Sequence, residues 1–396
     1  MPKYLFLLIV LAACSAPQNN NDHAAKNPAS DSAAPKPVSQ EQAADTVAVN
    51  DTLNDVAGLI AGSLSNSAVF NGITNDKDYL AFSESFSKKW KTFDSTRIAK
   101  LAGFRNNELN KVVKPENTLF YPFSGPDILY ANLFFPDVER YIMIGLEPVG
   151  TLPDFNTTKN DSLDRYYNKL NTSLNAILNF SFFRTESMSN DLRNTEVDGT
   201  IHLLFLFLNR TGKSIVSAKA VTVDSTGNKV YLPSLKALKA EKLKTKGVEI
   251  KFKTKDHRLQ ELTYFSVNAA DYNLQSNPGF VSYLNSIKNF NVYLKGASYL
   301  LHKATFKTVR TVILNGATTV TQDDSGIALN YFKNDTHQWD YHFYGQYSKP
   351  IHMFAKHYQP LMDSLYRQQG AKQLDFGLGY NYRDKNSNFM IVTKQD

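Results

Sequence analysis

The spacing of apolar residues along the chain predicts several amphipathic helices. Between residues 161 and 180, seven apolar side chains recur every three or four positions, so they form one stripe along a helix. Asp161 is well placed to cap the amino terminus of this helix. Similar spacing, with Pro or Gly at some of the ends, predicts further helices at residues 53–60, 77–92, 278–288, 298–315 and 350–369.

Short apolar runs bounded by turn-forming residues predict strands. Residues 201–208 form an apolar run of a length that suits a buried strand. Residues 224–228 have the composition of a hairpin turn, so residues 215–223 and 229–232 are expected to pair. Other strands are expected at residues 140–146, 248–253, 262–267 and 389–393.

The predicted helices and strands are grouped along the chain rather than alternating, and this grouping indicates an α+β fold. We expect a mixed, largely antiparallel sheet packed with helices. The folded domain is expected to span residues 53–396, either as one body or as two lobes of about residues 53–195 and 196–396.

Residues 15–50 differ from the rest of the chain in composition. They are rich in Ala, Pro, Ser, Asn, Gln and Asp and contain no aromatic residue. Such a segment cannot bury enough apolar surface to offset the entropy of ordering it. We therefore predict a disordered tether before the folded domain.

The first residues have the pattern of a processing signal. After a basic residue, an apolar run at residues 4–10 leads into Leu11-Ala12-Ala13-Cys14. The run is far shorter than the roughly 20 residues that a membrane-spanning helix needs. The pattern resembles the signal peptide and lipobox of bacterial lipoproteins. The resemblance implies that residues 1–13 are removed, that Cys14 carries lipid such as palmitate, and that residues 14–50 tether the domain to a membrane.

Localisation and charge indicate the partners. Ser15 follows Cys14 where an acidic residue would indicate inner-membrane retention, so we expect the outer membrane, facing the periplasm or the cell surface.

Cys14 is the only cysteine, so the fold gains no intramolecular disulfide even where disulfides could form. The formal net charge is +7. Because export argues against nucleic acid, we expect the membrane and an envelope glycan or protein as partners.

Lysines concentrate in one segment of the chain. We interpret them as the solvent face of an edge strand, protected by charge against aggregation, since Lys251 and Lys253 alternate with apolar residues at 248–253. Binding of an anionic glycan or lipid headgroup is the alternative. The segment contains Lys236, Lys239, Lys242, Lys244, Lys246, Lys251, Lys253 and Lys255.

Four blocks combine turn formers with acidic or aromatic residues: residues 120–127, 145–150, 322–326 and 342–347. Together they resemble an uncharacterised family of exported bacterial proteins, over about residues 115–395. That resemblance implies no activity, cofactor or fold. Rigid loops cost little entropy to hold for binding, so we expect the four blocks to line one concave surface on one side of the domain.

The acidic residues of these blocks are candidates for catalysis. A glycosidase needs two carboxylates in one cleft. Alternatively, Asp127 caps the following helix or turn, and residues 322–326 form an ordinary turn. The candidate catalytic residues are Asp127, Glu147, Asp323 and Asp324, and the candidate ligand-binding residues are Tyr121, Ser124, Asp127 and Tyr344.

Other catalytic patterns are weaker or absent from the sequence. Ser124 lacks the Gly-x-Ser-x-Gly elbow of hydrolases, although His302 or His342 could serve as a base. The chain has no HExxH motif, no second cysteine and no glycine-rich phosphate loop. We predict no cofactor and no metal.

Two functions from different classes remain. We prefer a lipid-anchored envelope protein that acts by binding or as a structural component, because the chain has a tether and no catalytic motif. The alternative is a hydrolase that acts on an envelope polymer such as a glycan through paired carboxylates. Carboxylates gathered around one cleft would favour the hydrolase, and scattered carboxylates would favour binding.

The lipobox leads to a direct prediction. Cys14→Ser removes the thiol that would be acylated, so the precursor should stay without lipid and leave the detergent phase on partitioning. Incorporation of labelled palmitate in a diderm bacterium measures the modification. Wild-type protein that takes up no label would contradict the lipoprotein interpretation.

Overall fold

The computed structural model describes residues 47–156, 160–180, 197–240, 242–382 and 387–395. These residues belong to one compact unit. The predicted signal peptide, Cys14 and the predicted tether up to residue 46 lie outside the described residues. Within the described part, no helix is both long enough and apolar enough to span a membrane.

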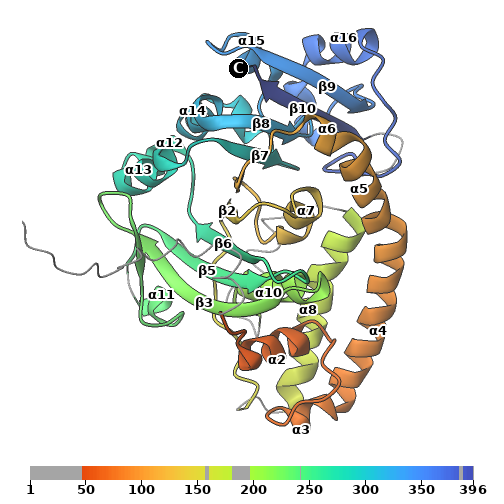
Figure 1. Ribbon diagram of the computed structural model, residues 1–396, viewed down its shortest axis with the longest axis vertical. Coiled ribbons are helices and arrows are strands. Elements are labelled where there is room, and N and C mark those ends of the chain that lie inside the picture. Colours follow the sequence, from red (N-terminus) through yellow and green to blue (C-terminus); the bar gives the residue numbers. More distant parts are fainter. Residues whose placement is uncertain (1–46, 157–159, 181–196, 241, 383–386, 396) are drawn as a thin grey trace, which may run out of the picture. The chain divides into compact units, whose positions relative to one another are not determined.

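The described strands form one ten-stranded sheet in the order β4-β3-β5-β6-β2-β1-β7-β8-β10-β9 (Figure 1). The four pairs between β6 and β8 are parallel, and the other five neighbouring pairs are antiparallel. The predicted α+β class and mixed sheet are therefore confirmed. The strands are β1 (Thr118–Tyr121), β2 (Arg140–Gly145), β3 (Ser214–Val223), β4 (Lys229–Tyr231), β5 (Lys246–Lys253), β6 (Leu259–Ser266), β7 (Phe290–Leu294), β8 (Ala317–Gln322), β9 (Trp339–Gly345) and β10 (Asn388–Lys394).

Helices cover both faces of the sheet, because the central strands are apolar on both faces. In β1, Leu119 and Tyr121 belong to one buried cluster and Phe120 to the other. The first face is covered by α2 (Asp51–Ile60), α4 (Lys77–Phe93), α5 (Ala99–Phe104), α7 (Ile128–Phe134), α8 (Asn160–Phe180) and α10 (Ile201–Arg210). The second face is covered by α12 (Asp271–Leu274), α13 (Pro278–Ser286), α14 (Lys307–Gly316), α15 (Leu329–Lys333) and α16 (Pro360–Gln368).

Short helical turns complete the described part. They are α3 (Asn71–Thr74), α6 (Asn110–Val112), α11 (Ala237–Ala240), two π-helical turns (Asp94–Ile98 and Arg105–Leu109) and three 3₁₀ segments (Leu300–His302, Ala304–Phe306 and His352–His357).

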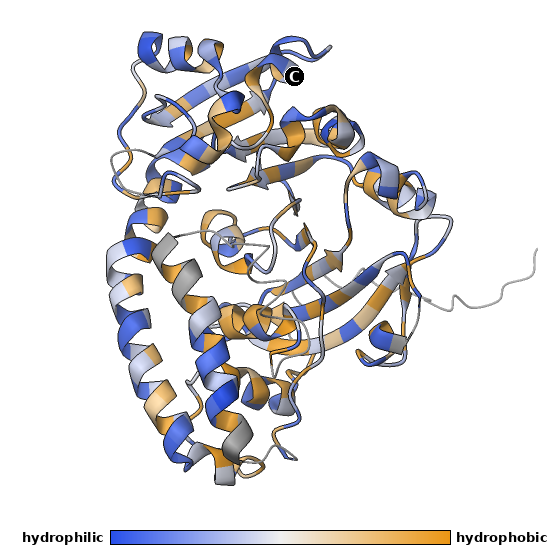
Figure 2. Ribbon diagram, turned by 180° about the vertical axis from the view of Figure 1, so that it is seen from behind, coloured by the Kyte–Doolittle hydropathy of each residue, from blue (hydrophilic) through white to orange (hydrophobic). Residues whose placement is uncertain are grey.

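The two long helices confirm the predicted amphipathic stripes. α4 and α8 run side by side (Figure 1), and their buried faces meet through aromatic rings. Phe82 of α4 stacks on Tyr167 of α8 with ring centroids 4.5 Å apart. In Figure 2 both helices carry hydrophilic as well as hydrophobic residues, as helices with one solvent-facing side should.

The structure overturns the strand predicted at residues 201–208. This segment forms the helix α10, in which residues 201–208 are all buried, and Figure 2 shows it as an almost uniformly apolar helix. It packs against α2 and α7. An apolar run without periodicity fits a helix buried on all sides as well as a buried strand, so the pattern could not separate them.

The structure also corrects three smaller predictions made from the sequence. The helix predicted at 298–315 begins only at Lys307, after 3₁₀ turns, and the helix predicted at 350–369 begins only at Pro360. β5 lies between β3 and β6, so its lysines do not protect a sheet edge. Lys253 is itself buried.

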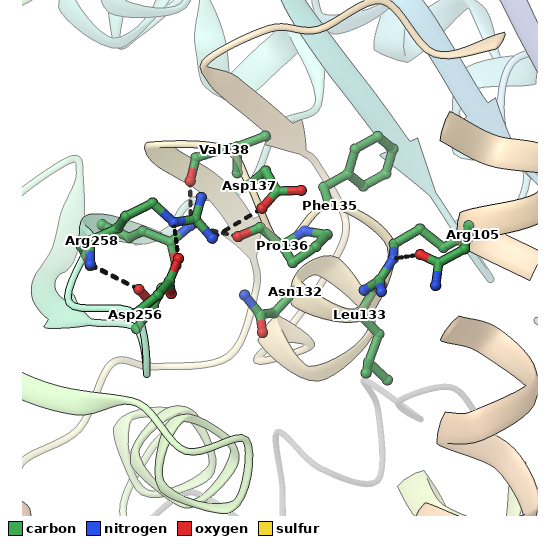
Figure 3. Close-up of polar contacts among 12 residues, drawn as sticks. Arg105, Asn132, Leu133, Phe135, Pro136, Asp137, Val138, Asp256 and Arg258 are labelled. Atoms are coloured by element: carbon green, nitrogen blue, oxygen red, sulfur yellow. Dashed lines mark hydrogen bonds and ion pairs between the residues drawn. The ribbon is translucent and has the colours of Figure 1, made fainter. Parts of the chain in front are cut away.

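Polar contacts surround the carboxyl end of α7 and the loop that follows it (Figure 3). Arg105 donates a hydrogen bond to the carbonyl oxygen of Leu133. Arg258, in the hairpin between β5 and β6, forms ion pairs with Asp137 and Asp256. All seven residues of α7 are buried. This short helix is therefore fixed between the sheet and its neighbours.

Candidate functional site

A cavity of about 370 Å³ opens at the carboxyl ends of four parallel strands. The loops that follow β1, β2, β6 and β7 line it. Apolar side chains supply most of the wall: Phe123, Ile144, Leu146, Val267, Leu300 and Phe306. The polar and charged side chains in the lining are Tyr121, Ser124, Asp127, Glu147, Asn268, Tyr272, Lys295, Ser298, Lys303 and Thr305. This volume is in the range of small-molecule sites.

The strand order explains why a cavity forms here. From β1 the chain passes through α7, on one face of the sheet, to β2. From β7 it passes through α14, on the other face, to β8 on the opposite side of β1. The loops that leave β1 and β7 therefore diverge on opposite faces of the sheet. Such a topological switch point is where open α/β sheets bind ligands.

A buried ion pair joins the two diverging loops. Lys295 Nζ lies 2.6 Å from Asp127 Oδ2, and the two side chains are 2% and 0% exposed. The same carboxylate oxygen accepts a hydrogen bond of 2.9 Å from the Tyr121 hydroxyl. Lys295 Nζ also lies 3.4 Å from the centroid of the Tyr130 ring.

Asp127 also starts the helix α7, because its Oδ1 accepts a hydrogen bond of 3.3 Å from the backbone N–H of Tyr130. Burial raises the pKa of Asp127, and Lys295 opposes that rise. Burial likewise lowers the pKa of Lys295, and Asp127 opposes that fall. The dry surroundings therefore bring the ionised and the neutral forms of the pair closer in energy than they are in water.

Glu147 lies on the β2 side of the cavity and is 1% exposed. The Tyr264 hydroxyl donates a 2.9 Å hydrogen bond to the Glu147 carbonyl oxygen, and burial together with the Glu147 charge raises the pKa of Tyr264. A Cβ on Gly145 would come 2.5 Å from Glu147 Oε2 and 2.5 Å from the Tyr264 hydroxyl, so a larger residue there would displace these side chains. The backbone is thus built closely around this carboxylate.

Strained backbone concentrates in the two loops of the ion pair. Among the described residues, five non-glycine residues have positive φ, and three of them lie here: Phe123 at 60°, Ser298 at 53° and Tyr299 at 53°. Such conformations cost of order 1–3 kcal/mol each and cluster at functional sites. The strained backbone therefore supports a functional role for these two loops.

The third block, residues 322–326, supports the loop after β7 through hydrogen bonds. Asp323 Oδ2 accepts a 2.9 Å hydrogen bond from the N–H of Gly296. Asp324 accepts hydrogen bonds from the Tyr299 hydroxyl at 2.5 Å and from Asn388 at 3.0 Å. Both acids are buried and neither lines the cavity. Burial, reinforced by Asp324, raises the pKa of Asp323 to about 7.

The structure brings together only part of the predicted site. Tyr121, Ser124, Asp127 and Glu147 line the cavity, whereas Asp323 and Asp324 lie behind its wall. Tyr344 does not line it, because its ring packs on Phe104 of α5 with centroids 5.0 Å apart.

The remaining predictions concern helix capping, two histidines and the fourth block. Asp127 does cap a helix, as the alternative interpretation proposed. His302 and His342 do not line the cavity, and no residue of the fourth block, 342–347, does so. The expectation that all four blocks line one surface therefore holds for the first two blocks only.

Sequence reasoning missed Lys295. It directly follows β7, a five-residue strand that was not predicted. The available signal is the mostly apolar and aromatic segment at residues 290–294, followed by Lys295 and Gly296, which is similar to the strand and loop at Glu147.

Comparison of the chain with protein-family models, with curated proteins and with solved structures finds no match. The site must therefore be interpreted from its own geometry.

The raised pKa of Asp323 predicts how stability depends on pH. Between its ordinary value of 3.8 and about 7, the folded state binds a proton that the unfolded state has lost. The contribution of Asp323 to the free energy of unfolding should therefore fall as pH rises from about 4 to 7. Asp323→Asn should flatten this dependence in denaturant titrations across that range.

Asp375→Asn, at an exposed position, serves as the matched control and should keep the wild-type slope. Equal slopes for wild type and Asp323→Asn would show that Asp323 titrates alike in the folded and unfolded states.

Proposed function

We propose that this chain is a lipid-anchored cell-envelope protein whose folded domain binds a small molecule in the cavity at the carboxyl ends of β6, β2, β1 and β7. The observation that carries the proposal is the cavity itself, placed at a switch point and walled by strained, well-supported loops. The lipid anchor rests on the lipobox around Cys14.

The cavity lining indicates the kind of ligand. Its walls are mostly apolar. Of its four charged groups, Asp127 and Lys295 already neutralise each other, and Glu147 and Lys303 carry opposite charges. A ligand with an apolar body and one polar group fits this lining better than a highly charged ligand does.

A hydrolase is the second candidate, because Asp127 and Glu147 line the same cavity. It would act on an envelope polymer such as a glycan. Binding is favoured because Asp127 is already engaged by Lys295, Tyr121 and the N–H of Tyr130. If the hydrolase were correct, Glu147→Gln would abolish turnover of a glycan substrate and leave ligand binding intact.

A small probe tests the binding function. We expect 3-phenylpropan-1-ol, which has an apolar ring and one hydroxyl, to bind the mature chain with a Kd on the order of 1 mM. At ten times that concentration it should stabilise the fold by roughly 1.4 kcal/mol, measured as a rise in melting temperature.

Ala269→Phe places a ring at a buried, cavity-lining position and should abolish the rise. Val69→Phe, at a residue that is 59% exposed and outside the lining, should keep it. Equal rises for both variants would place the probe elsewhere and contradict the proposal.

A further inference from the structure

Lys295 differs from an ordinary surface lysine in position and surroundings. It is the first residue after β7, it lines the cavity, and its side chain is 2% exposed. The carboxylate of Asp127 and the ring of Tyr130 both contact its amine. A buried amine of this kind can lose its proton more easily than a hydrated amine can.

The amine also has a proton acceptor in contact. Asp127 Oδ2 lies 2.6 Å from Nζ, within the distance of direct proton transfer. Burial shifts the two pKa values in opposite directions, which makes transfer of the proton from the amine to the carboxylate less costly than in water. Tyr121 donates to the same oxygen and lines the same cavity.

We propose that Lys295 captures a small aldehyde or ketone in the cavity as a reversible imine. The inference rests on the proposed binding function and names the chemical class of the ligand. The ligand's apolar body would lie against the walls formed by Phe123, Val267 and Phe306, with its carbonyl group toward Lys295.

The chemistry balances without any other reactant. Asp127 takes a proton from the Lys295 ammonium, and the nitrogen lone pair attacks the carbonyl carbon while the carbonyl electron pair moves to oxygen. A proton then moves from the attacking nitrogen to that oxygen, which gives a neutral carbinolamine. Its hydroxyl then leaves as water, with the proton that Asp127 held, and a C=N bond forms. Nothing is oxidised or reduced.

The product keeps the charge balance on which the loops depend. A protonated imine carries the same positive charge as the ammonium, so Asp127 regains its carboxylate form beside a cation. The reaction therefore exchanges an ammonium for an iminium and leaves no uncompensated buried charge. Lys295 can therefore form an imine and still balance the charge of Asp127, which keeps the two loops joined.

Borohydride trapping tests the inference on the full mature chain. The probe is 3-phenylpropanal, and 3-phenylpropan-1-ol is the matched compound that cannot form an imine. Brief reduction with borohydride should leave a secondary amine on Lys295, located by peptide mass spectrometry. Lys303, exposed at the cavity rim, is the internal control and should be labelled at least tenfold more slowly. Excess alcohol should suppress labelling of Lys295.

Two variants complete the experiment. Asp127→Asn keeps a residue that caps helices but removes both the group that returns a proton to the departing hydroxyl and the charge that balances the iminium, so labelling of Lys295 should slow at least tenfold while Lys303 is unchanged. Ala269→Phe keeps the ion pair and fills the cavity, so it should also prevent labelling of Lys295 and provides the test should Asp127→Asn fail to fold.

The failures are distinguishable. If the alcohol binds and Lys295 is labelled no faster than Lys303, the imine is wrong and the binding function stands. If the alcohol does not bind and Lys295 is not labelled, both proposals fail for this class of ligand.

Discussion

The candidate site depends on one buried ion pair. Asp127 starts α7 on one face of the sheet, and Lys295 directly follows β7, the strand beside β1 on the other side of the switch point. Removing one partner of such a pair leaves an uncompensated buried charge, at a cost of about 3–5 kcal/mol. The pair thus fixes the separation of two loops whose divergence creates the cavity.

The residues around the ion pair support those two loops. Asp323 and Asp324 hold the β7 loop through Gly296 and Tyr299, and the backbone around Glu147 closes the β2 side. These hydrogen bonds offset the strain at the positive-φ residues. A cavity fixed in this way needs little reordering on binding, which preserves affinity for a small ligand.

Much of the fold follows from the sequence, and the failures have physical causes. The stripe at 161–180 and the turn at 224–228 confirm that periodicity and turn chemistry determine local structure. The strands β1 and β7 have only four and five residues and are buried on both faces, so they are too short to show the alternation that would reveal them. Lys295 was missed along with β7, whereas Asp127 and Glu147 stood out because rigid turns surround them. Tyr344 misled because an aromatic residue looks alike in a core and in a binding site.

A double-mutant cycle on Asp127 and Lys295 tests the central claim most directly. Denaturant titration of Asp127→Asn, Lys295→Met and the double variant yields the coupling free energy between the two side chains. If the buried pair joins the loops, the double variant should be more stable than the sum of the single changes predicts, by about 2 kcal/mol or more. Single changes that add to within about 0.5 kcal/mol would contradict the account.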